Sequence, residues 1–180
     1  MKIAVIYAST EGQTRKIALR AMSTLQHEDH SVALIHANDA GALELSEFEA
    51  ALLAGSVHLG KHQPELVDFA KDHASALNAM PTMFLSVSLA AASDDETDLA
   101  DLGTYGDRFV SETGWKPGRI KYVAGAFKFT EYDFFKYWAM RWIKARNDPS
   151  TSSDESYEYT DWDDLDEALR DWMHDAATAG

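Results

Sequence analysis

The sequence predicts a three-layer, doubly wound α/β fold with a five-stranded parallel sheet. Short apolar runs of strand length alternate along the chain with segments whose apolar residues recur at helical spacing. The runs are nearly continuous, as in strands buried on both faces, and strands that alternate with helices favour a parallel sheet covered on both sides. Because 180 residues suffice for one sizeable core, residues 1–180 are expected to form a single domain.

The first strand, loop and helix are expected at the start of the chain. Lys2–Tyr7 is an apolar run, and residues 14–25 show helical periodicity. The hydroxyl-rich turn Ala8–Thr14 lies between them. Its amides and the positive end of the helix would point at one spot, to which hydroxyl groups add donors, and this favours a bound phosphate. The simpler interpretation is a helix capped by Ser9 or Thr10.

The rest of the chain continues the alternation. Further strands are expected at Ser31–His36, Ala50–Gly55, Thr82–Ser88 and Ile120–Phe127. Helical segments are expected at 45–48, at 64–77 with Pro64 in the first turn, and from Leu102 until Gly114 ends the helix. The last helix is expected at 162–176, where the pattern Thr160–Asp163 resembles a capping box. Gly55–His62 and Ala91–Asp101 are expected to be loops.

The N-terminal loop has neither the spacing of the Gly-rich dinucleotide fingerprint nor the Lys of a P-loop. It resembles the phosphate loop of flavodoxins, Ser/Thr-x-Glu/Asp-Gly-x-Thr/Ser, which wraps the terminal phosphate of FMN. The matching residues are Ser9, Thr10, Glu11, Gly12, Gln13 and Thr14. The resemblance implies FMN as cofactor and the flavodoxin-like strand order 2-1-3-4-5.

In that order a ligand binds at the carboxyl edge of the sheet, between the first and third strands. The loops at this edge are Ser9–Thr14, Ser56–His62 and Ser86–Tyr105. The two later loops are expected to hold the flavin ring through Ser56, Val57, His58, Leu59, Gly60, Ser86, Val87, Ser88 and Leu89. The simpler alternative is that these are ordinary loop residues that bind no ligand.

Composition excludes several classes of protein. The chain has no Cys, so disulfides, thiolate metal sites and Cys nucleophiles are excluded. The net charge of −14 argues against nucleic acid as a partner. No apolar run reaches membrane-spanning length, and the first strand leaves no room for a signal peptide, so a cytoplasmic protein is expected.

Residues 128–158 are predicted to be an insertion before the last helix. A helix at 132–146 would separate an aromatic face from a cationic face, which suits an anionic lipid surface or a large anionic aromatic ligand. The residues expected to face substrate or membrane are Phe135, Lys136, Trp138, Arg141, Trp142 and Lys144. Alternatively the aromatic face docks on the edge of the sheet. Tyr157–Tyr159 is expected to rejoin that edge as a short strand.

Taken together, the chain resembles the flavodoxin-type, menaquinone-dependent protoporphyrinogen IX dehydrogenases of bacterial haem synthesis. The segments that carry the resemblance are Ser9–Ala18, Gly55–His62, Asn78–Leu89, Trp115–Pro117, Ala124–Phe129 with Tyr132 and Asp133, and Tyr159–Trp162. Leu59 stands where that family tends to have an aromatic residue, and Ala90–Leu99 is acidic where the family is basic. These departures leave open a paralogue with the same fold and another electron donor.

The resemblance implies that bound FMN takes electrons from protoporphyrinogen IX and passes them to a quinone, at the cytoplasmic side of the membrane. Two other functions stay open: an electron carrier that docks through its acidic surface, and an FMN-dependent quinone reductase supplied by a nicotinamide. His58 and His62 are nearest the expected flavin ring and could relay a proton, although a surface position is the simpler interpretation. No metal site is expected.

Overall fold

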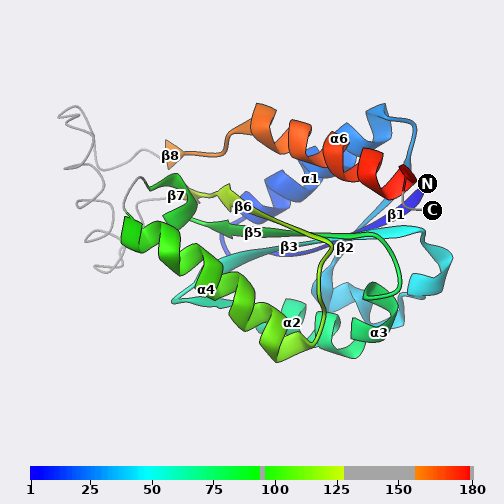
Figure 1. The fold of residues 1–180 in the computed structure, drawn as a ribbon, viewed down its shortest axis with the longest axis horizontal. Coiled ribbons are helices and arrows are strands. Elements are labelled where there is room, and N and C mark those ends of the chain that lie inside the picture. Colours follow the sequence, from blue (N-terminus) through cyan, green and yellow to red (C-terminus); the bar gives the residue numbers. More distant parts are fainter. Residues whose placement is uncertain (94–95, 128–156, 179–180) are drawn as a thin grey trace.

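The computed structural model describes residues 1–93, 96–127 and 157–178 of the chain (Figure 1). The strands are β1 (Lys2–Ala8), β2 (Ser31–His36), β3 (Ala50–His58), β4 (Lys61–His62), β5 (Thr82–Ser88), β6 (Arg119–Ala124), β7 (Ala126–Phe127) and β8 (Tyr157–Glu158). The α-helices are α1 (Gln13–His27), α2 (Pro64–Asp72), α3 (Ala74–Leu77), α4 (Glu96–Thr113) and α6 (Trp162–Thr178), and short 3₁₀ turns cover Ala37–Ala42, Leu45–Glu47 and Ala90–Ala92.

The main sheet has the predicted strand order. Its path is β2-β1-β3-β5-β6, which corresponds to 2-1-3-4-5 for the five long strands, and each neighbouring pair is parallel. The predicted doubly wound fold is therefore confirmed. In this order β1 and β3 are neighbours. The segment after β1 leads to a helix on one face of the sheet and the segment after β3 to a helix on the other face, so the carboxyl ends of the two strands flank a crevice.

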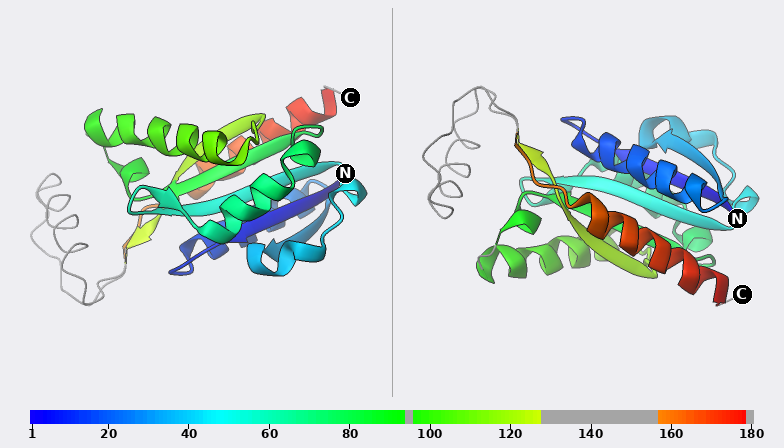
Figure 2. Two further views of the ribbon diagram at one scale, coloured as in Figure 1. Left: turned by 90° about the horizontal axis from the view of Figure 1, so that it is seen from below. Right: turned by 90° about the horizontal axis from the view of Figure 1, so that it is seen from above.

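Helices cover both faces of the sheet. In Figure 2 the right-hand view has α1 and α6 in front of the sheet, and the left-hand view has α2, α3 and α4 in front of the other face. The core on the first side includes Ile17, Leu25, Leu169 and Trp172. The core on the second side includes Leu66, Phe84, Phe109 and Trp115. Two buried faces explain why the strands are continuous apolar runs: all seven residues of β5 are buried.

The predicted loop Gly55–His62 is wrong, because most of it is a β-hairpin. Strand β3 runs on to His58, turns through Leu59 and Gly60, and returns as β4, antiparallel to β3. Leu59 and Gly60 both have positive φ, 50° and 75°, as the two central residues of a tight hairpin turn require. Leucine rarely adopts a positive φ, and Leu-Gly stands here in place of the usual Asn-Gly turn signal. The sequence pattern therefore did not predict this hairpin.

The predicted fifth strand, Ile120–Phe127, is interrupted at Gly125. Strand β6 ends at Ala124, and Ala126–Phe127 forms the separate strand β7. Strand β8 pairs antiparallel with β7, so the expectation that Tyr157–Tyr159 rejoins the main sheet edge is also wrong. The amide of Gly125 still donates to the carbonyl of Ser88 at 3.1 Å, and its own carbonyl accepts from Tyr159 N. Gly125 is therefore the point where the chain leaves one sheet for the other.

Helix boundaries differ from the predictions at three places. The segment 64–77 is divided at His73 into α2 and α3. Helix α4 begins at Glu96, inside the predicted loop Ala91–Asp101. Asp161 rather than Thr160 caps α6, because its Oδ1 accepts from Asp164 N at 3.0 Å. The predicted helix at 132–146, with its candidate substrate or membrane residues, lies outside the described residues.

No helix in the described ranges combines the length and apolar character needed to cross a membrane.

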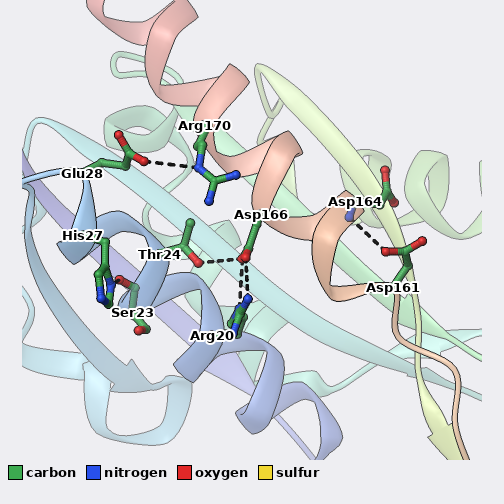
Figure 3. A network of polar contacts seen from close by, with 9 residues as sticks. All are labelled: Arg20, Ser23, Thr24, His27, Glu28, Asp161, Asp164, Asp166 and Arg170. Carbon is green, nitrogen blue, oxygen red and sulfur yellow. Dashed lines mark hydrogen bonds and ion pairs between the residues drawn. The ribbon is translucent and has the colours of Figure 1, made fainter.

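A buried carboxylate fastens α6 to α1 (Figure 3). Asp166 on α6 is 6% exposed and accepts two hydrogen bonds from the guanidinium of Arg20, at 2.6 and 3.1 Å, and one from Thr24 Oγ1 at 2.6 Å. Burial alone would raise the pKa of Asp166, but the hydrogen bonds from Arg20 and Thr24 outweigh it and hold the pKa below its usual value. The helix that closes one face of the sheet is thus held to the helix that begins at the crevice.

We expect Asp166→Ala to lower the free energy of unfolding by about 1–3 kcal/mol at pH 7, because Thr24 and Arg20 lose their shared acceptor. Urea unfolding measures this, with exposed Glu167→Ala on the same helix as the matched control. A carboxylate with a lowered pKa stabilises the fold fully above its unfolded value of about 3.9, and the contribution disappears as the pH falls through the folded value. A difference between wild type and Asp166→Ala that stays constant from pH 7 to about pH 3 would contradict this assignment.

Candidate functional site

A cleft with about 510 Å³ of empty space lies at the carboxyl edge of the main sheet. The residues that line the cleft are Ser9, Thr10, Glu11, Gln13, Thr14, Ser56, Val57, His58, Val87, Ser88, Leu89, Gly125 and Ala126. They come from the segment after β1, from the carboxyl ends of β3 and β5 with the turn after β5, and from the segment after β6, so residues from the three expected segments meet at one place.

The loop between β1 and α1 directs backbone amides at the cleft. Gly12 is the N-cap of α1 and has a left-handed backbone, φ 91°, which favours glycine. The first intrahelical hydrogen bond of α1 runs from Lys16 N to Gly12 O at 3.1 Å, so the amides of residues 13–15 have no acceptor within the helix. No side chain caps the helix in the structure, so the alternative of a Ser9 or Thr10 cap is wrong. Ser9 Oγ instead accepts from Gly12 N at 3.0 Å.

Thr14 provides a specific test of whether this loop suits an anion. Its side chain is 1% exposed, and its hydroxyl oxygen is buried without a hydrogen-bond partner among the described residues. A buried hydroxyl without a partner is unfavourable, and a ligand oxygen in the adjoining cleft would remove that cost. Within the part of the chain that the structure describes, the residues that line the cleft include no Lys or Arg. Amides, hydroxyls and the helix N-terminus are therefore the donors that this cleft offers to a phosphate.

Two side-chain amides hold the loop from opposite sides. Gln13 Nε2 donates to Thr160 Oγ1 at 2.9 Å, and Thr160 Oγ1 donates to the carbonyl of Ala124 at 2.7 Å, which ties the loop to the end of β6. Gln63, at the start of α2, donates from Nε2 to Thr10 Oγ1 at 3.3 Å and also to Ser56 Oγ. The loop conformation is thus determined by contacts far away in sequence.

The structure brings together most of the predicted site residues. Ser56, Val57 and His58 line the cleft from β3, and Val87, Ser88 and Leu89 line it from β5 and the turn that follows. The cleft lining does not include Gly12, Leu59, Gly60 or Ser86. It does include Gly125 and Ala126, which the sequence analysis missed because it placed them inside a continuous strand.

Ser86 and His62 form a buried pair behind the cleft. Ser86 is 0% exposed, and its Oγ lies 3.0 Å from His62 Nε2. The imidazole packs against the rings of Phe84 and Phe109, with centroids 5.1 and 5.0 Å away. Burial lowers the pKa of His62 to about 4. The surface position considered for His62 is therefore wrong, and the buried neutral ring does not line the cleft as a proton relay would.

A second cleft, with about 810 Å³ of empty space, lies between β6, β8 and the start of α6. Its lining includes Glu158, Asp161 and Asp164, and its one cationic lining residue, Lys121, is already paired with Asp164 at 2.6 Å. This acidic cleft is unsuited to an anion, so the first cleft is the candidate site.

The chain matches the family model described as "Flavodoxin domain" over residues 4–154. It is 24% identical over 174 residues to "Protoporphyrinogen IX dehydrogenase [quinone]" of Escherichia coli K12, covering 97% of this chain and 96% of that protein. A protein of the same name from Leishmania major is 28% identical over 162 residues, covering 89% of this chain and 70% of that protein.

Among solved structures, a flavodoxin of Streptococcus pneumoniae TIGR4 superposes with a TM-score of 0.59 at 17% identity and covers 100% of both chains. A flavodoxin mutant of Fusobacterium nucleatum bound to flavin mononucleotide superposes with a TM-score of 0.51 at 14% identity, covering 96% of this chain and 93% of that chain. These likenesses agree with the observed sheet order and helix layers.

We expect the His62 imidazole to stay neutral from pH 8 to about pH 5, because its pKa is about 4. An NMR titration of the imidazole ring protons measures this. The resonance of His62 is the one that disappears in His62→Gln and remains in the control variant His174→Gln, which changes an exposed histidine. Because the unfolded chain binds this proton at about pH 6.5, the free energy of unfolding should fall as the pH drops from about 6.5 toward 4. A His62 titration midpoint above pH 6 would show that the ring is not buried as described.

Proposed function

Because the chain belongs to the flavodoxin domain family, we propose that it is an FMN-dependent oxidoreductase that oxidises protoporphyrinogen IX to protoporphyrin IX with a quinone as electron acceptor. The observation that carries this proposal is the likeness to two proteins named protoporphyrinogen IX dehydrogenase [quinone], one of which matches over nearly the full length of both chains. The cleft supports the proposal, because its N-terminal loop offers neutral donors suited to a phosphate in the place where a cofactor of this family would bind.

The residues present fit FMN. The amides at the start of α1, the hydroxyl of Thr14 and the hydroxyls of Ser9 and Thr10 would hold the phosphate. The segments Ser56–His58 and Val87–Leu89 would hold the ring system, with apolar contacts from Val57, Val87 and Leu89. When bound, FMN supplies the redox chemistry, since it accepts electrons from one partner and passes them to another.

The protein's own contribution is to bind and orient. Among the described residues that line the cleft, Glu11 and His58 are titratable, and burial lowers the pKa of His62 behind the cleft to about 4. Oxidation of protoporphyrinogen IX to protoporphyrin IX removes six electrons and six protons, so three quinones are reduced to quinols for each porphyrin. The same site would therefore complete three cycles per porphyrin, with the chain holding the reactants close and apart from water.

A second candidate function is an electron carrier. The net charge of −14 favours steering of cationic protein partners to an acidic surface. A carrier would exchange electrons with other proteins and would not need to bind a porphyrinogen.

The proposed contact with substrate or membrane belongs to the segment 132–146. It rests on the sequence pattern of Phe135, Lys136, Trp138, Arg141, Trp142 and Lys144. It stays a prediction, because the segment lies outside the described residues.

We expect Thr14→Val to weaken FMN binding about 10- to 100-fold, because a hydrogen bond to a charged phosphate is worth about 1.5–3 kcal/mol. The same change should leave the free energy of unfolding of the FMN-free protein equal or slightly higher, since it removes a buried hydroxyl without a partner. Quenching of flavin fluorescence measures the first effect and urea unfolding the second.

Thr14→Ser is the matched control for that experiment, because it keeps the hydroxyl and should keep most of the affinity for FMN. Riboflavin, which lacks the phosphate, should bind wild type and Thr14→Val with similar affinity. An equal loss for FMN and riboflavin would place Thr14 away from the phosphate.

Mixing the FMN-loaded protein with protoporphyrinogen IX under anaerobic conditions should bleach the flavin absorbance much faster than free FMN at the same concentration. Addition of a water-soluble quinone should then restore the absorbance. Stopped-flow spectroscopy measures both steps, with NADH and NADPH as parallel electron donors. Bleaching by a nicotinamide alone would identify a nicotinamide-supplied quinone reductase. Bleaching by none of these donors faster than free FMN would favour the carrier.

A further inference from the structure

Gln63 does not line the cleft, but it contacts two residues that do. Its side chain is buried, with 7% exposed, between the end of β4 and the start of α2. From Nε2 it donates to Thr10 Oγ1, in the loop before α1, and to Ser56 Oγ, near the end of β3. One amide group thus joins the segment that would hold the phosphate to a segment that would hold the ring.

The backbone around Gln63 keeps this amide in place. The carbonyl of Gln63 accepts from the amides of Leu66 and Val67 at 3.1 and 3.2 Å, which fixes the residue at the first turn of α2. Gly55 on β3 permits the close approach: a Cβ there would lie 2.4 Å from Leu66 Cδ2 and 3.5 Å from Gln63 Oε1. The position of the side chain is therefore set by α2 packing directly on β3.

The orientation of the amide decides which way two hydroxyl protons point. A hydroxyl has one proton to donate and lone pairs to accept with. Thr10 and Ser56 both accept from Gln63 Nε2, so each keeps its own proton for another acceptor. Both residues line the cleft, and the acceptors that a phosphate and a flavin ring present there would receive these protons.

The other end of the amide indicates what this orientation costs. Gln63 Oε1 is buried and has no hydrogen-bond partner among the residues that the structure describes. With the amide reversed, Oε1 could accept the protons of both hydroxyls, but those protons would then point away from the cleft. The observed orientation leaves one oxygen without a partner and keeps two donors available to a ligand.

We propose that Gln63 is a positioning residue that makes Thr10 and Ser56 hydrogen-bond donors toward the bound cofactor. The role rests on the proposed binding of FMN. The described residues that line the cleft include no Lys or Arg, so each neutral donor aimed at an anionic ligand matters, and Gln63 directs two.

The test compares Gln63→Glu with Gln63→Leu. At pH 8 a glutamate side chain of the same shape can only accept, so it would take the protons of both hydroxyls and turn lone pairs toward the cofactor. We expect Gln63→Glu to weaken FMN binding by about 30-fold or more and Gln63→Leu by about 3- to 10-fold, since free hydroxyls can still rotate toward the ligand. Flavin fluorescence quenching gives the dissociation constants, and Gln26→Glu, an exposed change of equal charge on α1, should leave them unchanged.

A pH profile and a ligand comparison separate this role from simple packing. Protonation of the glutamate restores a donor, so the ratio of the FMN dissociation constants of Gln63→Glu and wild type should shrink between pH 8 and pH 6. Riboflavin should lose less affinity than FMN in Gln63→Glu, because it makes no use of Thr10 as a phosphate donor.

Other outcomes would overturn the proposal. If Gln63→Glu bound FMN as wild type does, or better than Gln63→Leu, the amide would serve packing only. Should Gln63→Glu fail to fold, as judged by circular dichroism, the cycle of Ser56→Ala, Gln63→Leu and the double variant decides: independent effects on FMN affinity would contradict the proposed coupling. Failure of wild type itself to bind FMN would refute the proposed function instead, so the two failures are distinguishable.

Discussion

The proposed binding of FMN places one physical constraint on the cleft: the phosphate would have to be held at the start of α1 by neutral donors. The amides of the first turn, the hydroxyl of Thr14 and the helix dipole are all available at this point, and the described residues that line the cleft include no Lys or Arg. Hydrogen bonds to a phosphate are directional, so their value depends on how accurately the donors are placed. The rest of the fold can be understood as the means of placing them.

That placement comes from contacts between distant segments rather than from the loop itself. Gln13 reaches Thr160 at the start of α6, and Gln63 reaches Thr10 from the start of α2. On the α6 side, the buried Asp166 joins α6 to Arg20 and Thr24 of α1. Helices on opposite faces of the sheet therefore both fix the same short loop. A donor set held from two sides loses little entropy when a ligand binds, which favours tight binding of a cofactor.

The sequence predicted the parts of this molecule that depend on local patterns. Continuous apolar runs, helical periodicity and the Ser9–Thr14 motif were enough for the layers, the strand order and the location of the cleft. Features that depend on tertiary contacts could not be predicted from the sequence. The hairpin turn at Leu59 and Gly60 has no Asn-Gly signal, because Leu stands where a positive φ is needed. The break at Gly125 accompanies the pairing between β7 and β8. His62 could not be distinguished from a surface histidine until Phe84 and Phe109 were seen to enclose it.

The acidity of the chain bears on how such a site can work. With a net charge of −14, the long-range field opposes the approach of a phosphate and of a porphyrinogen with its carboxylates. Binding must therefore rely on short-range donors, which act only once the ligand is in the cleft and are little affected by the overall charge. A site built from amides and hydroxyls does this without burying a cation, whose loss of hydration would need compensation whenever the cleft held no anion. A neutral donor set and an acidic surface are thus compatible, and in the proposed role of Gln63 the affinity for the cofactor would depend on where the hydroxyl protons of Thr10 and Ser56 point rather than on charge.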